Sequence, residues 1–396
     1  EQKKGGGGGG ADARARAAYA RGRALDAAAA YSAEAEADLS RAVKLAPDFV
    51  DAWCALGHCF WKKNDLNAAR DCYEGARDRQ PTPDALRALS VLCRSVPPKS
   101  PDDDVHGQSV AHARHAAKLD GSGESWYVLG NAHVQRYFSR GRAGRKPEDL
   151  LMAARVYARA EAAFEKAGPP CAAPPNLPGR FGHPDLHFNR AHLRRYVEDY
   201  GGAAADFEAS RALDASLGGA DARDDVRRWV RRVEDLAKRR AGLKPKKRGE
   251  LDAKLLSAVS APETFGLADL ADLAPSPLDS QAAHLGKSPN SGKALFLVVA
   301  LELRKGGSVP PDALLCLGRA SGKENEPPCV ALSVYDGDTA KLVPGATVLV
   351  LDPVVVDVPG ESGGYRAVHV TDASKLRVDG VALRRVYAGQ ASSTAL

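Results

Sequence analysis

The sequence lacks the features of a membrane protein, of a disulfide-stabilised secreted protein and of a zinc module. Its longest apolar run, ALFLVVAL at 294–301, is too short to span a bilayer. No signal peptide is visible, although the chain begins EQKKGGGGGG without a methionine, which is typical of a fragment. The seven cysteines are scattered without a CxxC pair, which predicts a reducing compartment and no disulfide framework.

The sequence motifs of catalysis are also missing. There is no P-loop, no HExxH and no glycine fingerprint for a nucleotide. Cys93 and the histidines near it could be drawn as a nucleophile and base, but a buried helix thiol is the favoured interpretation. We therefore expect a protein that is not an enzyme and that needs neither a cofactor nor a metal.

What the 396 residues do contain is three regions of different composition, with a formal net charge of +6. The first is rich in Ala, Arg, Leu and Asp at helical spacing, the second is basic and then rich in Pro, Ser and Gly, and the third has short Val- and Leu-rich runs. The expected boundaries are a disordered glycine-rich tail at 1–15, a helical repeat domain with a capping helix at 16–240, a basic linker at 241–292, a small β-domain at 293–385 and a tail at 386–396.

The helical region contains internal repeats. One unit matches the tetratricopeptide pattern at eight positions, which are Trp53, Leu56, Gly57, Phe60, Ala69, Tyr73, Ala76 and Pro81. The small Gly57 and Ala69 let two helices approach closely, and Pro81 ends the unit because it cannot continue a helix. Similar units lie upstream and downstream, and the one that opens at 126 carries an insertion, YFSRGRAGRKPED. Since each hairpin needs a neighbour to cover its apolar face, we expect a right-handed tetratricopeptide-repeat α-superhelix.

The stretch HPDLHFNR at 183–190 looks at first like a metal or acid/base cluster. On a repeat helix, however, Asp185, Asn189 and His192 share one face, whereas His187 falls on the packing side. Ligands of a metal must converge on one point, and these histidines diverge. Two alternatives remain, namely a solvated polar face and a groove that binds a peptide.

Equivalent positions of other repeats support the peptide groove. The second unit offers Asp51, His58 and Lys62 there, and the fourth offers Glu124, Tyr127, Asn131 and Gln135. An asparagine donates to and accepts from a peptide backbone at once. Arg94 could hold a carboxylate in a bidentate pair, and Asp185 could hold a cationic group. The predicted peptide-binding residues are Arg94, Asp185, Asn189, Asn131, His192 and Tyr127.

A basic segment follows the repeats. Residues 227–248 carry eleven Lys or Arg and two acidic residues, and they end in KPKKR. This pattern suits a solvated capping helix, a nuclear import signal or contact with the phosphates of an RNA. The sequence alone leaves these three alternatives open.

The C-terminal runs predict five or six short strands in a small Greek-key barrel such as an OB-fold. Barrels of this kind that bind nucleic acid stack bases on aromatic side chains. Residues 293–380 contain only Phe296, Tyr335 and Tyr365 as aromatics. We therefore favour a structural or protein-binding role for this barrel.

Three stretches, AVKLAPDFVDAWCALGHCFWKKNDLNAA, SWYVLGNAHVQRYFSRG and HPDLHFNRAHLRRYVEDYGGAAADFEASRALD, resemble the family of tetratricopeptide repeat protein five, also called Strap. The resemblance implies repeats followed by an OB-fold in a cytoplasmic and nuclear adaptor for tubulin autoregulation. Such an adaptor binds ribosomes that translate α- or β-tubulin, recognises the nascent Met-Arg-Glu-type N-terminus, and recruits a further adaptor and a deadenylase complex for mRNA decay. The resemblance also implies an alternative, a stress-responsive nuclear scaffold for acetyltransferase cofactors.

The resemblance assigns roles to particular residues. LSVLCR corresponds to a groove arginine, here Arg94, and PDLHxNR to a groove aspartate, here Asp185. The family's last acidic groove residue has only Asp221 as a candidate, because ALDASLGGAD departs from the family pattern. LKPKKR matches the ribosome-contacting stretch within the basic segment 238–248, where rRNA contact is implied. The implied ribosome-binding residues are Lys244, Lys246, Lys247 and Arg248.

Overall fold

The computed structural model describes the chain in ranges separated by gaps. These are residues 8–95, 97, 103–139, 146–168, 183–239, 245–256, 264–275, 288–303, 312–318, 329–335, 341–361, 363–370 and 372–383. Two compact units emerge, and each is described by itself. Unit one comprises residues 1–139 and 155–168, and unit two comprises residues 140–154 and 169–396.

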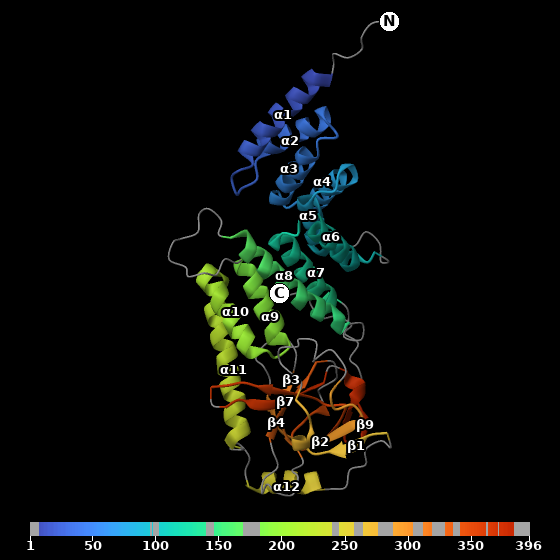
Figure 1. Cartoon of the computed structure of the whole chain (residues 1–396), viewed down its shortest axis with the longest axis vertical. Coiled ribbons are helices and arrows are strands. Elements are labelled where there is room, and N and C mark those ends of the chain that lie inside the picture. The colour runs from blue at the N-terminus through green and yellow to red at the C-terminus, as the bar shows by residue number, and fades with distance from the viewer. Residues whose placement is uncertain are drawn as a thin grey trace. The chain divides into compact units, whose positions relative to one another are not determined.

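Unit one is built from antiparallel helices, drawn in blue to green in Figure 1. Its helices are α1 (Gly8–Leu25), α2 (Ala33–Leu45), α3 (Val50–Lys62), α4 (Leu66–Arg79), α5 (Pro83–Ser95), α6 (Val105–Asp120) and α7 (Gly123–Ser139), with the later part of α8 (Pro147–Ala167). Helices α1 and α2, α3 and α4, and α5 and α6 pack as hairpins. The prediction of tetratricopeptide-like helical repeats is confirmed, and α1 begins inside the predicted N-terminal tail.

The hairpin of α3 and α4 shows why the repeat residues are needed. Ala69 is fully buried, and a Cβ added to Gly57 would lie 2.9 Å from the Tyr73 ring. Only glycine therefore allows the tyrosine to cross α3 at this distance. The Asp65 side chain accepts a hydrogen bond from the backbone N–H of Ala68 at 3.1 Å, which caps the start of α4.

Unit two joins the last repeat hairpin to a sheet. Its helices are α9 (Pro184–Tyr196), α10 (Tyr200–Leu213), α11 (Gly219–Arg239) and α12 (Pro245–Leu256). Its strands are β1 (Gly266–Ala268), β2 (Lys293–Leu303), β3 (Asp312–Gly318), β4 (Cys329–Val334), β5 (Thr347–Leu351), β6 (Val354–Val358), β7 (Tyr365–Val370), β8 (Leu376–Val378) and β9 (Val381–Ala382). The predicted strand runs are confirmed, and the run at 347–358 divides at Asp352 and Pro353 into β5 and β6.

The sheet is open, so the predicted OB-fold barrel is not confirmed. Its strand order is β6-β7-β4-β3-β2-β5-β8-β9, with β1 pairing in parallel to β2. Most neighbours are antiparallel, but β4 and β7 run parallel. Within the described strands, no ladder joins β6 at one edge to β8 and β9 at the other. The part of the prediction that is confirmed is a helical repeat array followed by a C-terminal sheet.

Both faces of the sheet are covered by apolar packing. Leu295, Leu297 and Val299 of β2 belong to a core on one face, and the alternating Phe296 and Val298 point to the other. Helices α9, α10 and α11 cover part of that second face through β4, β6 and β7, as Figure 1 shows for α11. Unit two therefore begins before the predicted domain boundary at 240.

The segment predicted to be a basic linker contains two elements of unit two. Helix α12 lies at 245–256, and β1 extends the sheet at 266–268. The physical reason is that Leu251 and Leu255 of α12 have an apolar surface to cover on β2. The glycine-rich residues 1–7 and the tail at 386–396 lie outside the described residues.

Candidate functional site

An arginine in the last turn of α5 is the most distinctive charge on the predicted groove face of unit one. Arg94 is half-buried, and its Nε donates to the Ser90 carbonyl at 3.1 Å. Burial lowers the pKa of Arg94, although the nearby hydroxyls of Tyr157 and Tyr127 act in the opposite direction. Within the described ranges, no carboxylate pairs with Arg94. A half-buried guanidinium without an internal anion is suited to bind a carboxylate from a ligand.

Two further predicted groove residues lie on α7, which contacts α5 in the same unit. Tyr127 and Asn131 are both half-buried. The hydroxyl of Tyr157, on α8, donates to Asn131 Oδ1 at 2.6 Å, and the rings of Tyr157 and Tyr127 lie 6.5 Å apart. Tyr157 thereby fixes the orientation of the Asn131 amide. Tyr157 is not among the groove residues predicted from the sequence, so the sequence missed the role of its hydroxyl.

The cations expected on the second repeat are neutralised inside unit one. Buried Asp26 accepts from Lys62 Nζ at 3.1 Å and lies 2.8 Å from His58 Nδ1. The Lys62 ammonium also donates to the Ala28 carbonyl at 2.7 Å. Asp51, the third polar position expected here, is exposed and forms no ion pair with a residue in the described ranges. Arg94 is therefore a better candidate for an anion than Lys62.

In unit two, α9 carries the predicted aspartate. Asp185 lies in the first helical turn, where the helix dipole favours a negative charge. Its side chain is 46% exposed, and its Oδ2 lies 3.3 Å from His183 Nδ1. Asn189, one turn further along α9, is half-buried. Asp185 is thus accessible to a cationic group of a ligand.

The two other histidines of α9 have different surroundings. His192 packs against Phe188 and Phe207, with ring centroids 4.7 Å and 5.1 Å apart. Burial, aided by the charge of Arg195, lowers the pKa of His192 to about 4, so the ring is neutral near pH 7. His187 is buried and lies 3.3 Å from Asp206, which confirms its predicted place on the packing side. Among the described residues, no group of three potential ligands forms a metal site.

A buried ionic cluster holds α9 against α10, and no local pattern in the sequence indicates it. Asp206 of α10 accepts two hydrogen bonds from Arg190, at 2.8 Å and 2.7 Å. Arg194 donates to the same carboxylate at 2.8 Å. Burial acts to raise the pKa of Asp206, but the bonds from His187 and Arg190 and the two guanidinium charges lower it. The cluster fixes the helix that presents Asp185.

The predicted ribosome-binding residues are only partly described. Lys246 and Lys247 are exposed on α12. Arg248 belongs to the same helix, whereas Lys244 lies outside the described residues. Asp221, the candidate for a further acidic groove residue, is exposed in the first turn of α11.

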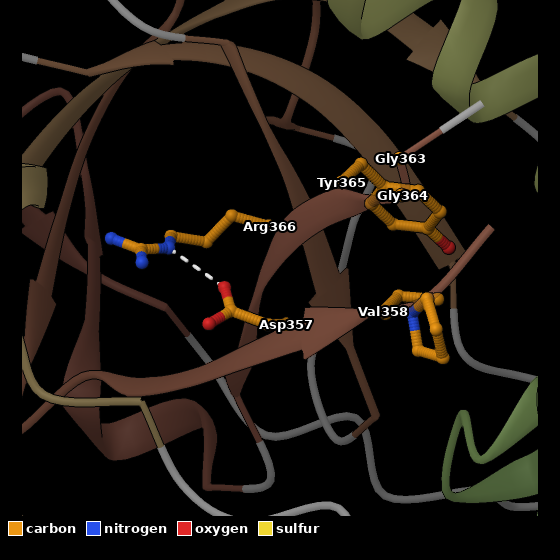
Figure 2. Close-up of a pocket in the computed structure, with 7 residues that line it drawn as sticks. Asp357, Val358, Gly363, Gly364, Tyr365 and Arg366 are labelled. Atoms are coloured by element: carbon orange, nitrogen blue, oxygen red, sulfur yellow. Dashed lines mark hydrogen bonds and ion pairs between the residues drawn. The ribbon is translucent and has the colours of Figure 1, made fainter.

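The hairpin of β6 and β7 borders a shallow depression of about 470 Å³. Figure 2 shows the side chains of Arg366 and Asp357, which both line it, side by side on neighbouring strands, with Arg366 Nε 2.9 Å from Asp357 Oδ1. Arg366 also donates to the Leu270 carbonyl at 3.2 Å. Because its charges already neutralise one another, this depression is a weaker ligand site than the surroundings of Arg94.

Comparison with known proteins identifies relatives of the chain. Tetratricopeptide repeat protein 5 of Homo sapiens is 31% identical over 326 residues, which are 81% of this chain and 68% of the human protein. The Mus musculus protein of the same name is 32% identical over the same shares. That of Bos taurus is 37% identical over 181 residues, 44% of this chain and 37% of the bovine protein. No family model matches the chain.

Solved structures of helical-repeat proteins are similar only at a low level. The antigen c5321 of uropathogenic Escherichia coli, which has an SLR fold, is 18% identical and covers 64% of this chain and 50% of its own, with a TM-score of 0.40. Yeast Tom70 is 12% identical over 58% of this chain and 42% of its own, with a TM-score of 0.38. None of the described helices combines the length and apolarity that crossing a membrane requires.

Proposed function

Because this chain belongs to the tetratricopeptide repeat protein 5 family, we propose that it is a non-enzymatic adaptor that reads the nascent N-terminal peptide of tubulin on the ribosome. Its repeats identify a protein-binding scaffold, and the finer assignment follows the family resemblance. Reading of the peptide would lead to decay of the tubulin mRNA through an adaptor and a deadenylase complex. The proposed places of action are the cytoplasm and the nucleus.

The observation that carries the proposal is the unneutralised charge of Arg94. Removing a guanidinium from water without a carboxylate costs free energy, and a ligand carboxylate recovers it. On α7, which contacts α5, the Asn131 amide can hydrogen-bond a peptide backbone, and Tyr127 offers a half-buried ring. These features support an acidic side chain of an extended peptide as the partner of Arg94.

Unit two supplies a complementary charge. Asp185 is accessible on α9, which the Asp206 cluster holds in place. A peptide that begins Met-Arg-Glu has a cation for Asp185 and a carboxylate for Arg94. A ligand that lacks either charge would leave Arg94 or Asp185 without its proposed partner, which gives selectivity as well as affinity. Asn189 and His192 complete the proposed peptide-binding set, with His192 contributing a neutral ring.

Contact with the ribosome is proposed for the basic segment at 238–248. Lys246 and Lys247 are exposed cations, and within the described part of the chain neither forms an ion pair. Cations of this kind displace counterions from RNA phosphates. Lys244 and Arg248 belong to the same proposal by their place in the sequence. The peptide site and the basic segment would then read the nascent chain and the ribosome together.

The test is capture of ribosomes that carry a tubulin nascent chain. The Arg94→Ala and Asp185→Ala variants should each lose most of the capture, because each leaves one ligand charge unpaired. Arg41→Ala and Asp235→Ala are matched controls, since both side chains are exposed outside the proposed site. Full capture by the Arg94→Ala, Asp185→Ala double variant would refute the proposal.

A second candidate function is a nuclear scaffold for acetyltransferase cofactors, which would use the same repeats. The exposure of Lys246 and Lys247 favours it, because an import receptor could reach them. Fluorescence microscopy of the wild type and of Lys246→Ala, Lys247→Ala separates the two functions. Loss of nuclear protein with intact ribosome capture supports the scaffold, and exclusively cytosolic wild type removes it.

A further inference from the structure

The aromatic side chains of the sheet are buried. Phe296, Tyr335 and Tyr365 are 2%, 5% and 9% exposed. Tyr335 packs against Tyr196, with ring centroids 5.2 Å apart, and Tyr365 belongs to the apolar cluster that α9, α10 and α11 form with the sheet. Stacking of bases needs an exposed ring. These three positions of the sheet therefore offer no stacking platform for a single-stranded nucleic acid.

Helix α12 covers the part of the sheet that contains Phe296. Leu251 and Leu255 are 2% and 4% exposed, and both pack in one cluster with Phe296. At the C-terminal part of α12, Lys254 Nζ donates to the Gly345 carbonyl at 2.7 Å. Figure 1 shows α12 beside the sheet, next to β2 and β1. The helix is therefore held at two kinds of contact, one apolar and one polar.

Docking of α12 fixes the position of its exposed cations. Lys246 and Lys247 precede Leu251 by one to two helical turns, and both point away from protein contacts, since they are exposed. A cation on a rigid helix loses less conformational entropy on binding than one on a free segment. The sheet would in this way act through α12, rather than through its own face.

We propose that the sheet displays α12 as a rigid element that contacts the phosphates of an RNA, and that docking of α12 is required for this contact. The proposal rests on the proposed binding to ribosomes and adds the positioning of the basic segment. Leu251 and Leu255 are the positioning residues, and Lys246 and Lys247 are the contacting residues. A flexible basic tail would need the lysines but not the leucines.

The experiment measures co-sedimentation of the full chain with ribosomes, together with hydrogen exchange of the α12 amides. Leu251→Ser, Leu255→Ser should raise exchange in α12 and weaken ribosome binding about tenfold, although every lysine remains. Lys246→Glu, Lys247→Glu should weaken binding at least as much and leave exchange unchanged. The double lysine variant should also make the affinity less dependent on salt. The slope of log affinity against log salt concentration should decrease by about the amount that two phosphate contacts contribute. Ala253→Ser is the matched control, because Ala253 is exposed on the same helix.

If the double serine variant does not fold, the milder Leu255→Ala variant replaces it. Its loss of ribosome binding should be in proportion to the increase in hydrogen exchange of its α12 amides. If either leucine variant binds ribosomes with wild-type affinity while hydrogen exchange shows that α12 is released, the docking proposal is overturned. The proposed binding to ribosomes would then still stand. Absence of wild-type co-sedimentation would instead overturn the proposed ribosome contact itself. Rapid exchange of α12 in the wild type would also contradict the docking proposal.

Discussion

Replacing Asp206 by asparagine tests whether the buried ionic cluster holds α9 in place. Asp206→Asn keeps the shape of the side chain but removes the charge that faces Arg190 and Arg194. The Asp206 and Arg190 side chains are 5% and 7% exposed, so water cannot solvate the unpaired guanidinium of Arg190. Breaking a buried pair on one side costs about 3–5 kcal/mol. That is a large part of the usual free energy of unfolding, about 5–15 kcal/mol.

The contribution of Asp206 to the free energy of unfolding depends on pH in a predictable direction. The folded pKa of Asp206 is lowered, so its contribution to stability is present above its unfolded pKa, about 3.9, and is lost as pH falls through the folded value. The difference in unfolding free energy between wild type and Asp206→Asn should therefore be constant from about pH 5 to 7. It should shrink below about pH 4, because the carboxyl of the unfolded wild type then binds a proton that the folded state does not bind until the pH reaches its lowered folded pKa.

Hydrogen exchange of the α9 and α10 amides is the suitable assay, because it reports on this hairpin separately from unit one. Asp225→Asn is the matched control. Asp225 pairs with Arg228 at the surface and is 54% exposed, so its replacement should cost below about 1 kcal/mol. A cost below about 1 kcal/mol for Asp206→Asn as well would refute the argument that the cluster locks α9 to α10.

Three further predictions concern single side chains. Gly57→Ala places a Cβ 2.9 Å from the Tyr73 ring and should lower the free energy of unfolding by about 1–3 kcal/mol. Thermal unfolding should show a lower Tm, and an unchanged Tm would show that the hairpin relaxes to accept the methyl group. Ser32→Ala removes the acceptor of the Ala35 N–H and should cost about 1 kcal/mol in urea unfolding, whereas restoration by Ser32→Asp would identify the cap as the cause. The pKa of His192 is lowered to about 4, so the stability that its neutral ring contributes above about pH 6.5 is lost as the pH falls toward 4, by about 3 kcal/mol. His192→Gln should therefore reduce the slope of the unfolding free energy against pH in this range. An unchanged slope would show that other groups cause it.

The repeat hairpins could be predicted from the sequence because their signals are local. Gly57, Ala69 and Tyr73 lie within one hairpin, and the contact that they make is the one that the pattern encodes. The strands were equally visible as apolar runs, but their order depends on distant pairings. The parallel pairing of β4 with β7, for example, joins Ala331 to Ala367 and has no local signature.

The site was predictable only in part, because burial of a charge depends on the partner helix. Arg94 and Asp185 were predicted from their places in the repeat and from the family resemblance, and their binding role stays a prediction. Asp206 and Arg190 resemble a solvated helix face in the sequence, yet they neutralise one another inside unit two. The sequence predicts a linker at the place of α12 because the helix has few apolar residues, and the surface that Leu251 and Leu255 cover begins about 40 residues later in the chain.

The measurement closest to the central claim is a double-mutant cycle between the protein and a Met-Arg-Glu-type peptide. Wild type should bind with micromolar affinity, about 7–9 kcal/mol, and a scrambled peptide should bind more weakly. Arg94→Ala combined with loss of the peptide's acidic side chain should show a coupling of about 1.5 kcal/mol or more, and so should Asp185→Ala combined with loss of the peptide's arginine. Additive effects in both cycles would contradict the assignment of Arg94 and Asp185 as the residues that read the peptide.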